Sequence, residues 1–172
     1  DKLYGIGSGA VMLQNNENVA AVIERFHGIC EALERKWPDV EIKFSEMPWY
    51  SERMSNYSLE ELLRENSDIQ AIFGLMESET TLYAQILKQM HLEGKIHLIT
   101  FDRSEKMMEL LEEGVVDAII VQQSYKIGYE SAKIAARLAK GEVPEEDTVY
   151  IGCSVISRRD LSILDKGENA DE

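Results

Sequence analysis

The chain has 172 residues, of which 44% are hydrophobic and 29% charged, with only 11 Gly and 3 Pro. These proportions are typical of a single globular domain and exclude fibrous and low-complexity proteins. The formal net charge is -14, which repels a phosphate backbone, so we expect no direct nucleic-acid binding by this chain. No apolar run approaches the roughly 20 residues that a membrane-spanning helix needs.

The first elements follow from glycine placement and apolar spacing. Residues 2–6 have the pattern of a short strand, and they lead into a glycine-rich turn that ends at Gly9. Apolar residues at helical spacing then predict a helix over about 16–37. Asn15 or Asn16 is the expected N-cap of this helix.

The rest of the chain alternates strand and helix patterns. The expected elements are a strand at 40–44, a loop at 47–57, a helix from a capping box at Ser58, strands at 69–75, 95–101, 117–121 and 148–156, and helices at 78–92, 104–113 and 125–140. Strands that each precede a helix are typical of an α/β fold with a doubly wound parallel sheet, a Rossmann-like three-layer sandwich. We expect residues 2–157 to form one lobe and residues 158–172 to form an acidic, flexible tail.

Doubly wound sheets bind ligands at the carboxyl ends of their strands. The residues expected there, in strand order, are Ser8, Trp49, Met76, Glu77, Asp102 and Gln122. Most of this rim is polar, which suits a polyhydroxylated small molecule. Polar residues are also what ordinary loops contain, and Asp102 could instead be the N-cap of the next helix or a solvated turn residue.

Motifs for catalysis or metal binding are missing from the sequence. The histidines, His27, His91 and His97, have no HExxH or other metal-ligand spacing. Cys30 and Cys153 have no CxxC partner and are expected to be buried thiols. The glycines at 5–9 match neither GxGxxG nor a Walker loop. We therefore predict no enzyme activity, no metal and no cofactor.

Several strings resemble one family in order and spacing. Glu24–Ile29 (ERFHGI) is similar to its E-R-x-x-G-F, Asp68–Phe73 (DIQAIF) to D-I-D-A-I-F, Ile99–Asp102 (ITFD) to V-G-F-D, Leu111–Ala118 (LEEGVVDA) to I-K-x-G-x-I-D-A, and Gln122–Tyr129 (QQSYKIGY) to Q-Q-P-Y-x-M-G-Y. That family comprises the type 1 sugar-binding periplasmic proteins and the ligand-binding cores of LacI-like transcription regulators. The strings belong to its second, C-terminal lobe, so the resemblance implies that the N-terminal lobe is missing here.

The resemblance also implies roles for individual residues. Arg25, which helical spacing alone would place in a surface salt bridge, would hydrogen-bond ligand hydroxyls. Asp102 would accept from two hydroxyls, and Gln122 would complete the wall. Trp49 could stack on a sugar ring. The family usually has N-D after the third strand, whereas this chain has Met76-Glu77, so Met76 brings no useful donor or acceptor to the ligand.

The expected function is recognition of a sugar or related polar ligand as one lobe of a solute-binding protein that serves a membrane permease of the ABC type. The alternatives are the effector-sensing core of a LacI-like regulator, which would form a homodimer, the sensing part of a sensor protein, or an enzyme or receiver domain on the same fold. A receiver domain would need a cluster of acidic residues after the first strand. A solute-binding protein would be extracytoplasmic and a regulator cytoplasmic.

Overall fold

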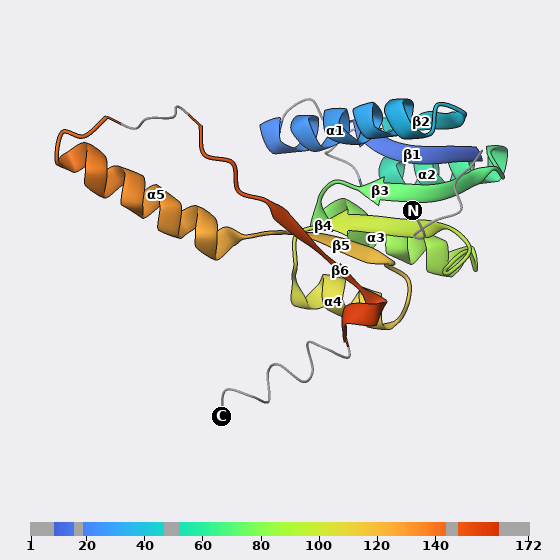
Figure 1. Ribbon diagram of the computed structural model, residues 1–172. Helices are drawn as coiled ribbons and strands as arrows, with labels where there is room; N and C mark the ends of the chain where they lie inside the picture. The colour runs from blue at the N-terminus through green and yellow to red at the C-terminus, as the bar shows by residue number, and fades with distance from the viewer. Residues whose placement is uncertain (1–8, 16–18, 47–51, 144–147, 162–172) are drawn as a thin grey trace.

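The computed structural model describes residues 9–15, 19–46, 52–143 and 148–161. Its centre is a six-stranded sheet in the order β2-β1-β3-β4-β5-β6 (Figure 1). The strands are β1 Gly9–Asn15, β2 Val40–Glu46, β3 Ile69–Gly74, β4 His97–Phe101, β5 Ala118–Gln122 and β6 Cys153–Ser157. The helices are α1 Ala20–Lys36, α2 Glu52–Glu65, α3 Glu77–Gln89, α4 Glu105–Glu112 and α5 Ser124–Ala139. Strands β1 to β5 are parallel, and β6 runs antiparallel to β5. The predicted α/β fold class is confirmed.

The beginning of the chain differs from the prediction. Gly9 begins β1 instead of ending a turn, because the apolar run that follows it is the strand that pairs with β2 and β3. The predicted first strand at 2–6, and Ser8 after it, lie outside the described residues. Helix α1 has Val19 as its N-cap, without a side-chain cap hydrogen bond. The predicted Asn15 cap is wrong because Asn15 ends β1.

Two further boundaries were misplaced. The predicted loop at 47–57 is partly helical, because α2 begins at Glu52 and the good helix formers at its start extend it. Ser58 therefore lies inside α2 and does not begin it. The predicted tail starts too early, since residues 158–161 continue as a helical turn after β6. Residues 162–172 lie outside the described part of the chain.

The sheet is covered unequally on its two faces. Helices α2, α3 and α4 cover one face, and α1 covers the other (Figure 1). Neighbouring residues of one strand point to opposite faces, so Leu98 packs with α3 and α4 while Ile99 packs with α1. On the α1 side, Ile120 of β5 is paired with Val155 of β6, whose side chain is 57% exposed. The β6 end of this face is therefore left open.

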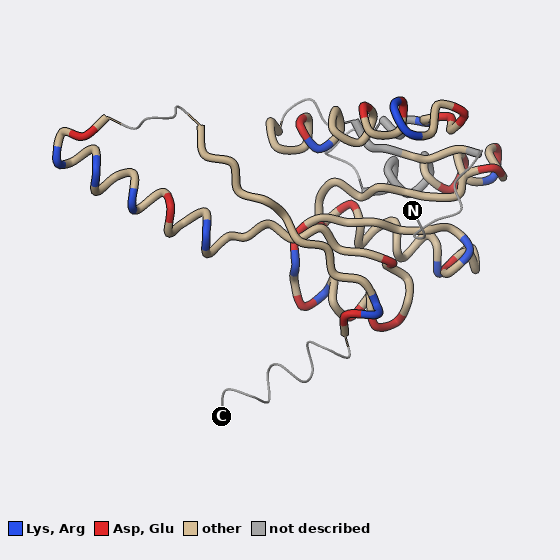
Figure 2. The backbone as a smooth tube through the Cα atoms, in the orientation of Figure 1, with Lys and Arg blue, Asp and Glu red and all other residues tan. Residues whose placement is uncertain are grey.

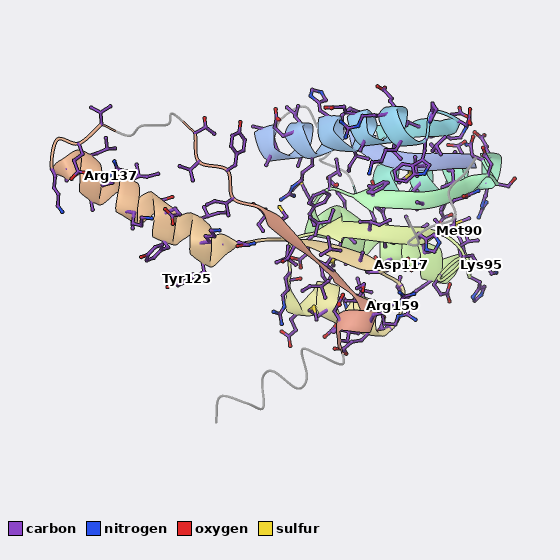
Figure 3. The ribbon with its side chains drawn as sticks, in the orientation of Figure 1. Met90, Lys95, Asp117, Tyr125, Arg137 and Arg159 are labelled. Carbon is purple, nitrogen blue, oxygen red and sulfur yellow. The ribbon has the colours of Figure 1, made fainter. Side chains whose placement is uncertain are left out.

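Helix α5 extends away from the rest of the structure (Figure 1) and has no buried residue. Tyr125 near its start is 86% exposed, and Leu138 near its end is also exposed. Its side chains, including Tyr125 and Arg137, are spread around a helix that has no other described helix or strand beside it (Figure 3). The charges along it are mainly basic (Figure 2): four basic and one acidic side chain lie between Ser124 and Lys140, a net of +3 in a chain of net -14.

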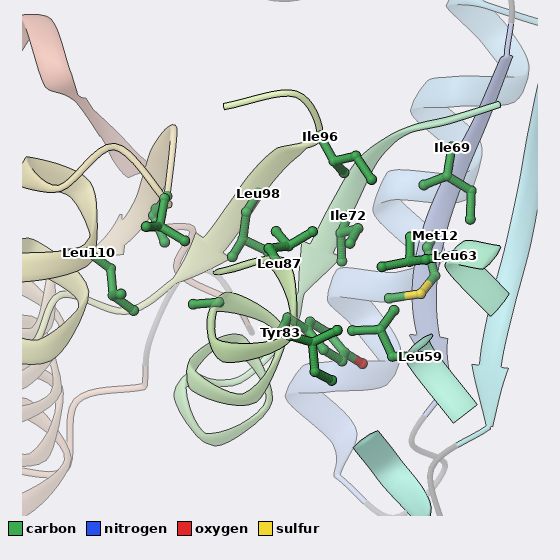
Figure 4. Close-up of a cluster of buried hydrophobic side chains, with 14 of the residues drawn as sticks. Met12, Leu59, Leu63, Ile69, Ile72, Tyr83, Leu87, Ile96, Leu98 and Leu110 are labelled. Atoms are coloured by element: carbon green, nitrogen blue, oxygen red, sulfur yellow. The ribbon is translucent and has the colours of Figure 1, made fainter. Parts of the chain in front are cut away.

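The largest hydrophobic cluster lies between the sheet and α2, α3 and α4 (Figure 4). Tyr83 and Leu87 of α3 are fully buried against Ile72 and Leu98 of the neighbouring strands. Burial of each such side chain contributes about 1.5–3 kcal/mol to folding. This cluster fixes β3 and β4 side by side, and so fixes where their carboxyl ends meet.

Candidate functional site

The candidate site lies at the carboxyl ends of β3, β4 and β5, next to the inner side of α1. Asp102 directly follows β4. Its backbone N–H donates to the carbonyl of Ile120 in β5 at 2.9 Å, and its φ is 68°. Left-handed backbone is unusual outside glycine, although Asp tolerates it better than most residues. The chain therefore turns sharply here and presents the carboxylate at the end of the sheet, and such strain is concentrated at functional sites.

Arg25 of α1 holds the Asp102 carboxylate. Its Nη2 donates to Oδ2 at 3.0 Å and to Oδ1 at 3.3 Å, and its Nη1 donates to the carbonyl of Leu75 at 2.7 Å. Its guanidinium carbon lies 4.5 Å from the centre of the Phe101 ring, within cation–π range. The Arg25 side chain is only 14% exposed, whereas that of Asp102 is 44% exposed. Arg25 is thus fixed by three protein groups, while Asp102 stays open to solvent.

Gln122, at the end of β5, completes this group. Its Nε2 donates to Asp102 Oδ1 at 2.6 Å. The predicted trio of Arg25, Asp102 and Gln122 is therefore brought together, although the sequence places the three far apart. A carboxylate can accept about four hydrogen bonds. Arg25 and Gln122 donate three of these, so Asp102 can accept about one more, through Oδ2, for example from a hydroxyl.

The structure does not support a surface salt bridge for Arg25 or an N-cap role for Asp102. Arg25 pairs with Asp102 across the fold, and among the described residues it makes no ion pair with its neighbours in α1. Asp102 is not the cap of α4, since Ser104 is: the Ser104 Oγ accepts from the backbone N–H of Met107 at 3.2 Å. Asp102 stands two residues before that cap, beside Arg25.

Met76 and Glu77 lie at the end of β3, as predicted, but they differ in environment. Met76 is half-buried and packs against the cluster of Val22, Leu75 and Phe101. Glu77 is exposed at the first turn of α3, where a negative charge favours the helix through its dipole. Trp49 and Ser8 lie outside the described residues.

The sequence interpretation missed two groups, the carbonyl of Leu75 and the ring of Phe101. Both position Arg25. The Phe directly before Asp102 in the matching string was the available signal. A carbonyl contact leaves no trace in residue type, because every residue has one.

The cysteines and histidines add no second site. Cys30 is half-buried on α1, and burial, followed by the nearby Glu34 charge, raises the pKa of its thiol. Cys153 is exposed, so its predicted burial is wrong, because β6 lies at the open edge of the sheet. Among the described residues there is no group of three or more His, Cys, Asp or Glu placed to hold a metal. In the same part of the chain, no helix has the length and hydrophobicity to cross a membrane.

Comparisons with known proteins agree with this architecture. A family model described as "Periplasmic binding protein domain" matches residues 2–143. A comparison with curated proteins finds no match. Among solved structures, a sugar ABC transporter sugar-binding protein from Bacillus halodurans is similar with TM-score 0.79 and 21% identity, over 91% of this chain and 58% of that one.

Two other solved structures bear on ligands and partners. An ABC transporter solute-binding protein from Agrobacterium vitis with bound D-fucose has TM-score 0.75 and 21% identity, over 90% of this chain and 53% of that one. XylFII in the XylFII–LytSN complex has TM-score 0.73 and 22% identity, over 90% and 54%. The chain therefore spans little more than half the length of these proteins, and the likeness shows its fold.

Proposed function

Because the chain belongs to the periplasmic binding protein domain family, whose members bind solutes and are not enzymes, we propose that it is one lobe of a sugar-binding protein serving an ABC-type transporter. The observation that carries the proposal is the Asp102 carboxylate, held by Arg25 and Gln122 at the sheet end yet 44% exposed. A carboxylate fixed in this way can accept from a sugar hydroxyl through the position left on Oδ2. Arg25 acts mainly by positioning it.

The second lobe of the protein is part of this proposal. The matched structures are nearly twice as long as the stretch this chain covers. Helix α5 leaves the carboxyl end of β5, where the site lies, and none of its residues is buried. An amphipathic helix is stable only when its apolar side packs on another element. We place the partner lobe against α5, so that the two lobes close over Asp102 when a ligand binds.

A role in sensing is the second candidate, because XylFII is similar in structure and is found with LytSN. In that case the ligand-bound lobe would contact a sensor protein instead of a permease. A transporter lobe and a partner of a sensor protein would both work outside the cytoplasm. A LacI-like regulator core would bind its effector in the cytoplasm, as a homodimer. The transporter, sensor and regulator functions would all use the same ligand site.

The test is ligand binding by the natural-length protein that contains this chain. A panel of pentoses, hexoses and polyols is screened by thermal shift, because any ligand that binds only the folded state stabilises it. The affinity of each hit is then measured by calorimetry for the wild type and for Asp102→Asn. Asn keeps the size of the side chain and tolerates the left-handed backbone, whereas Ala would add backbone strain.

We expect Asp102→Asn to weaken sugar binding by about 2–4 kcal/mol, because a carboxylate acceptor is replaced by a partial donor in a closed site. The matched control is Asp39→Asn, which makes the same charge change at an exposed residue before β2. Asp39→Asn should leave the affinity unchanged. A panel without any hit, or equal affinities for wild type and Asp102→Asn, would contradict the proposed function.

A further inference from the structure

An apolar side chain lies next to the polar group of the candidate site. Gly74 of β3 is paired with Thr100 of β4, so Met76 and Asp102 both stand two residues beyond this pair. Neighbouring strands are about 4.8 Å apart. Arg25 binds both the Leu75 carbonyl and the Asp102 carboxylate, so the segments that carry Met76 and Asp102 lie close together at the carboxyl edge of the sheet. Phe101 and Leu75, the residues that position Arg25, belong to the same hydrophobic cluster as Met76.

The Met76 position has little polar capacity for a ligand. Its carbonyl already accepts from Thr80 twice, from the backbone N–H at 3.0 Å and from Oγ1 at 2.8 Å. Its thioether cannot donate and accepts only weakly. The side chain packs against Val22, Leu75 and Phe101 but is only half-buried, so part of its apolar surface stays exposed near the strand ends. A hydroxyl placed against it would lose its hydrogen bonds to water without replacement.

We propose that Met76 makes this lobe selective for deoxy sugars, which present a hydroxyl to Asp102 and a methyl or methylene carbon to Met76. This rests on the proposed function, since it names the sugar class for the same site. A carbon without its hydroxyl contributes favourable burial against the thioether. The fully hydroxylated sugar leaves one hydroxyl unpaired in the closed site and is therefore disfavoured.

The experiment compares matched sugar pairs by calorimetry on the natural-length protein. The pairs are D-galactose with D-fucose, D-glucose with 2-deoxy-D-glucose, and D-ribose with 5-deoxy-D-ribose, which remove hydroxyls at different carbons. In at least one pair we expect the deoxy sugar to bind roughly 10-fold more tightly, the scale of one group in an apolar pocket. Met76→Asn should reduce or reverse this ratio, whereas Met76→Leu, which stays apolar, should keep it.

The outcomes separate this proposal from the function on which it rests. Sugar binding without a deoxy preference in any pair would overturn the role of Met76 and leave sugar recognition standing. A deoxy preference that Met76→Asn does not alter would also overturn it. Binding of no sugar at all would overturn both. The wild-type comparison needs no substitution, so the test holds even if Met76→Asn fails to fold.

Discussion

At the scale of single residues, the site depends on a close contact directly behind it. Thr80 and Thr100 are fully buried, and their hydroxyls lie 2.6 Å apart. Thr80 also holds the carbonyl of Met76. Gly74 makes room for this arrangement, since a Cβ on it would lie 2.2 Å from Thr80 Oγ1. One missing side chain in β3 therefore lets α3 approach β4 and fixes the strand ends that carry Met76 and Asp102.

We expect Gly74→Ala to lower the free energy of unfolding by about 1–3 kcal/mol, because the added methyl group overpacks a buried contact. Urea denaturation of the chain measures this change. Gly28→Ala is the control: Gly28 lies inside α1, and a Cβ there meets nothing within 4 Å. Ala at that helical position should be neutral or stabilising by about 0.5–1 kcal/mol. Equal effects of the two substitutions would show that the Thr80 contact does not limit packing.

At the scale of elements, the helices that surround the site begin in different ways. Helices α1 and α3 lack a side-chain cap hydrogen bond, whereas α4 is capped by Ser104. The cap lies two residues after Asp102, so it fixes the path of the chain as it leaves the site. Packing of α1 and α3 on the sheet compensates for their missing caps, since tertiary contacts supply most helix stability in proteins.

Ser104→Ala should cost about 1 kcal/mol of stability, because the backbone N–H of Met107 loses its acceptor. The melting temperature and urea midpoint report this loss. Ser131→Ala serves as the matched control. The Ser131 hydroxyl donates to the carbonyl of Ile127 on the exposed surface of α5, and such back-bonding contributes little to helix stability. A loss no greater than that of the control would argue against the cap.

At the scale of the whole molecule, the folded body and α5 differ in how they are stabilised. The body buries a continuous cluster between the sheet and three helices. Helix α5 contributes no buried residue. Its Tyr125 and Tyr129 stack on each other, with ring centres 6.3 Å apart, and Lys133 of the same helix lies 5.7 Å from the centre of the Tyr129 ring. A 16-residue helix without tertiary contacts is marginal in water. Its stability therefore has to come from outside the described part of this chain.

Hydrogen exchange tests this difference. In residues 1–172 alone, the amides of α5 should exchange far faster than those of α3, because α5 opens without disturbing the core. In the natural-length protein, the α5 amides should become protected because the proposed second lobe covers them. Helix α3, buried in both forms, is the internal control. Strong protection of α5 in the isolated chain would mean that it packs on its own body, which contradicts the two-lobe arrangement.

Elements whose sequence pattern lies within their own residues were predictable, whereas features set by contacts between distant residues were not. The order of β3, α3, β4, α4 and β5 followed from periodicity and glycine stops, because each element's pattern lies within its own residues. The start of β1, the cap of α1 and the start of α2 did not. A glycine before an apolar segment can end a turn or begin a strand. Pairing of the segment with β2 and β3 makes Gly9 the first residue of a strand.

The sequence by itself determined the α/β fold class and, through its resemblance to known strings, the choice of Arg25, Asp102 and Gln122. Only the tertiary structure decided how they are arranged. Arg25 binds the Asp102 carboxylate and the Leu75 carbonyl and lies over the Phe101 ring, the carboxylate stays partly exposed, and Met76 packs in the same cluster as Phe101. Those relations join residues far apart in the chain, and they are fixed by strand register and by burial, which no local pattern encodes. The same reason explains α5: its pattern predicts a helix, but only the fold shows that this helix has no partner in the described chain.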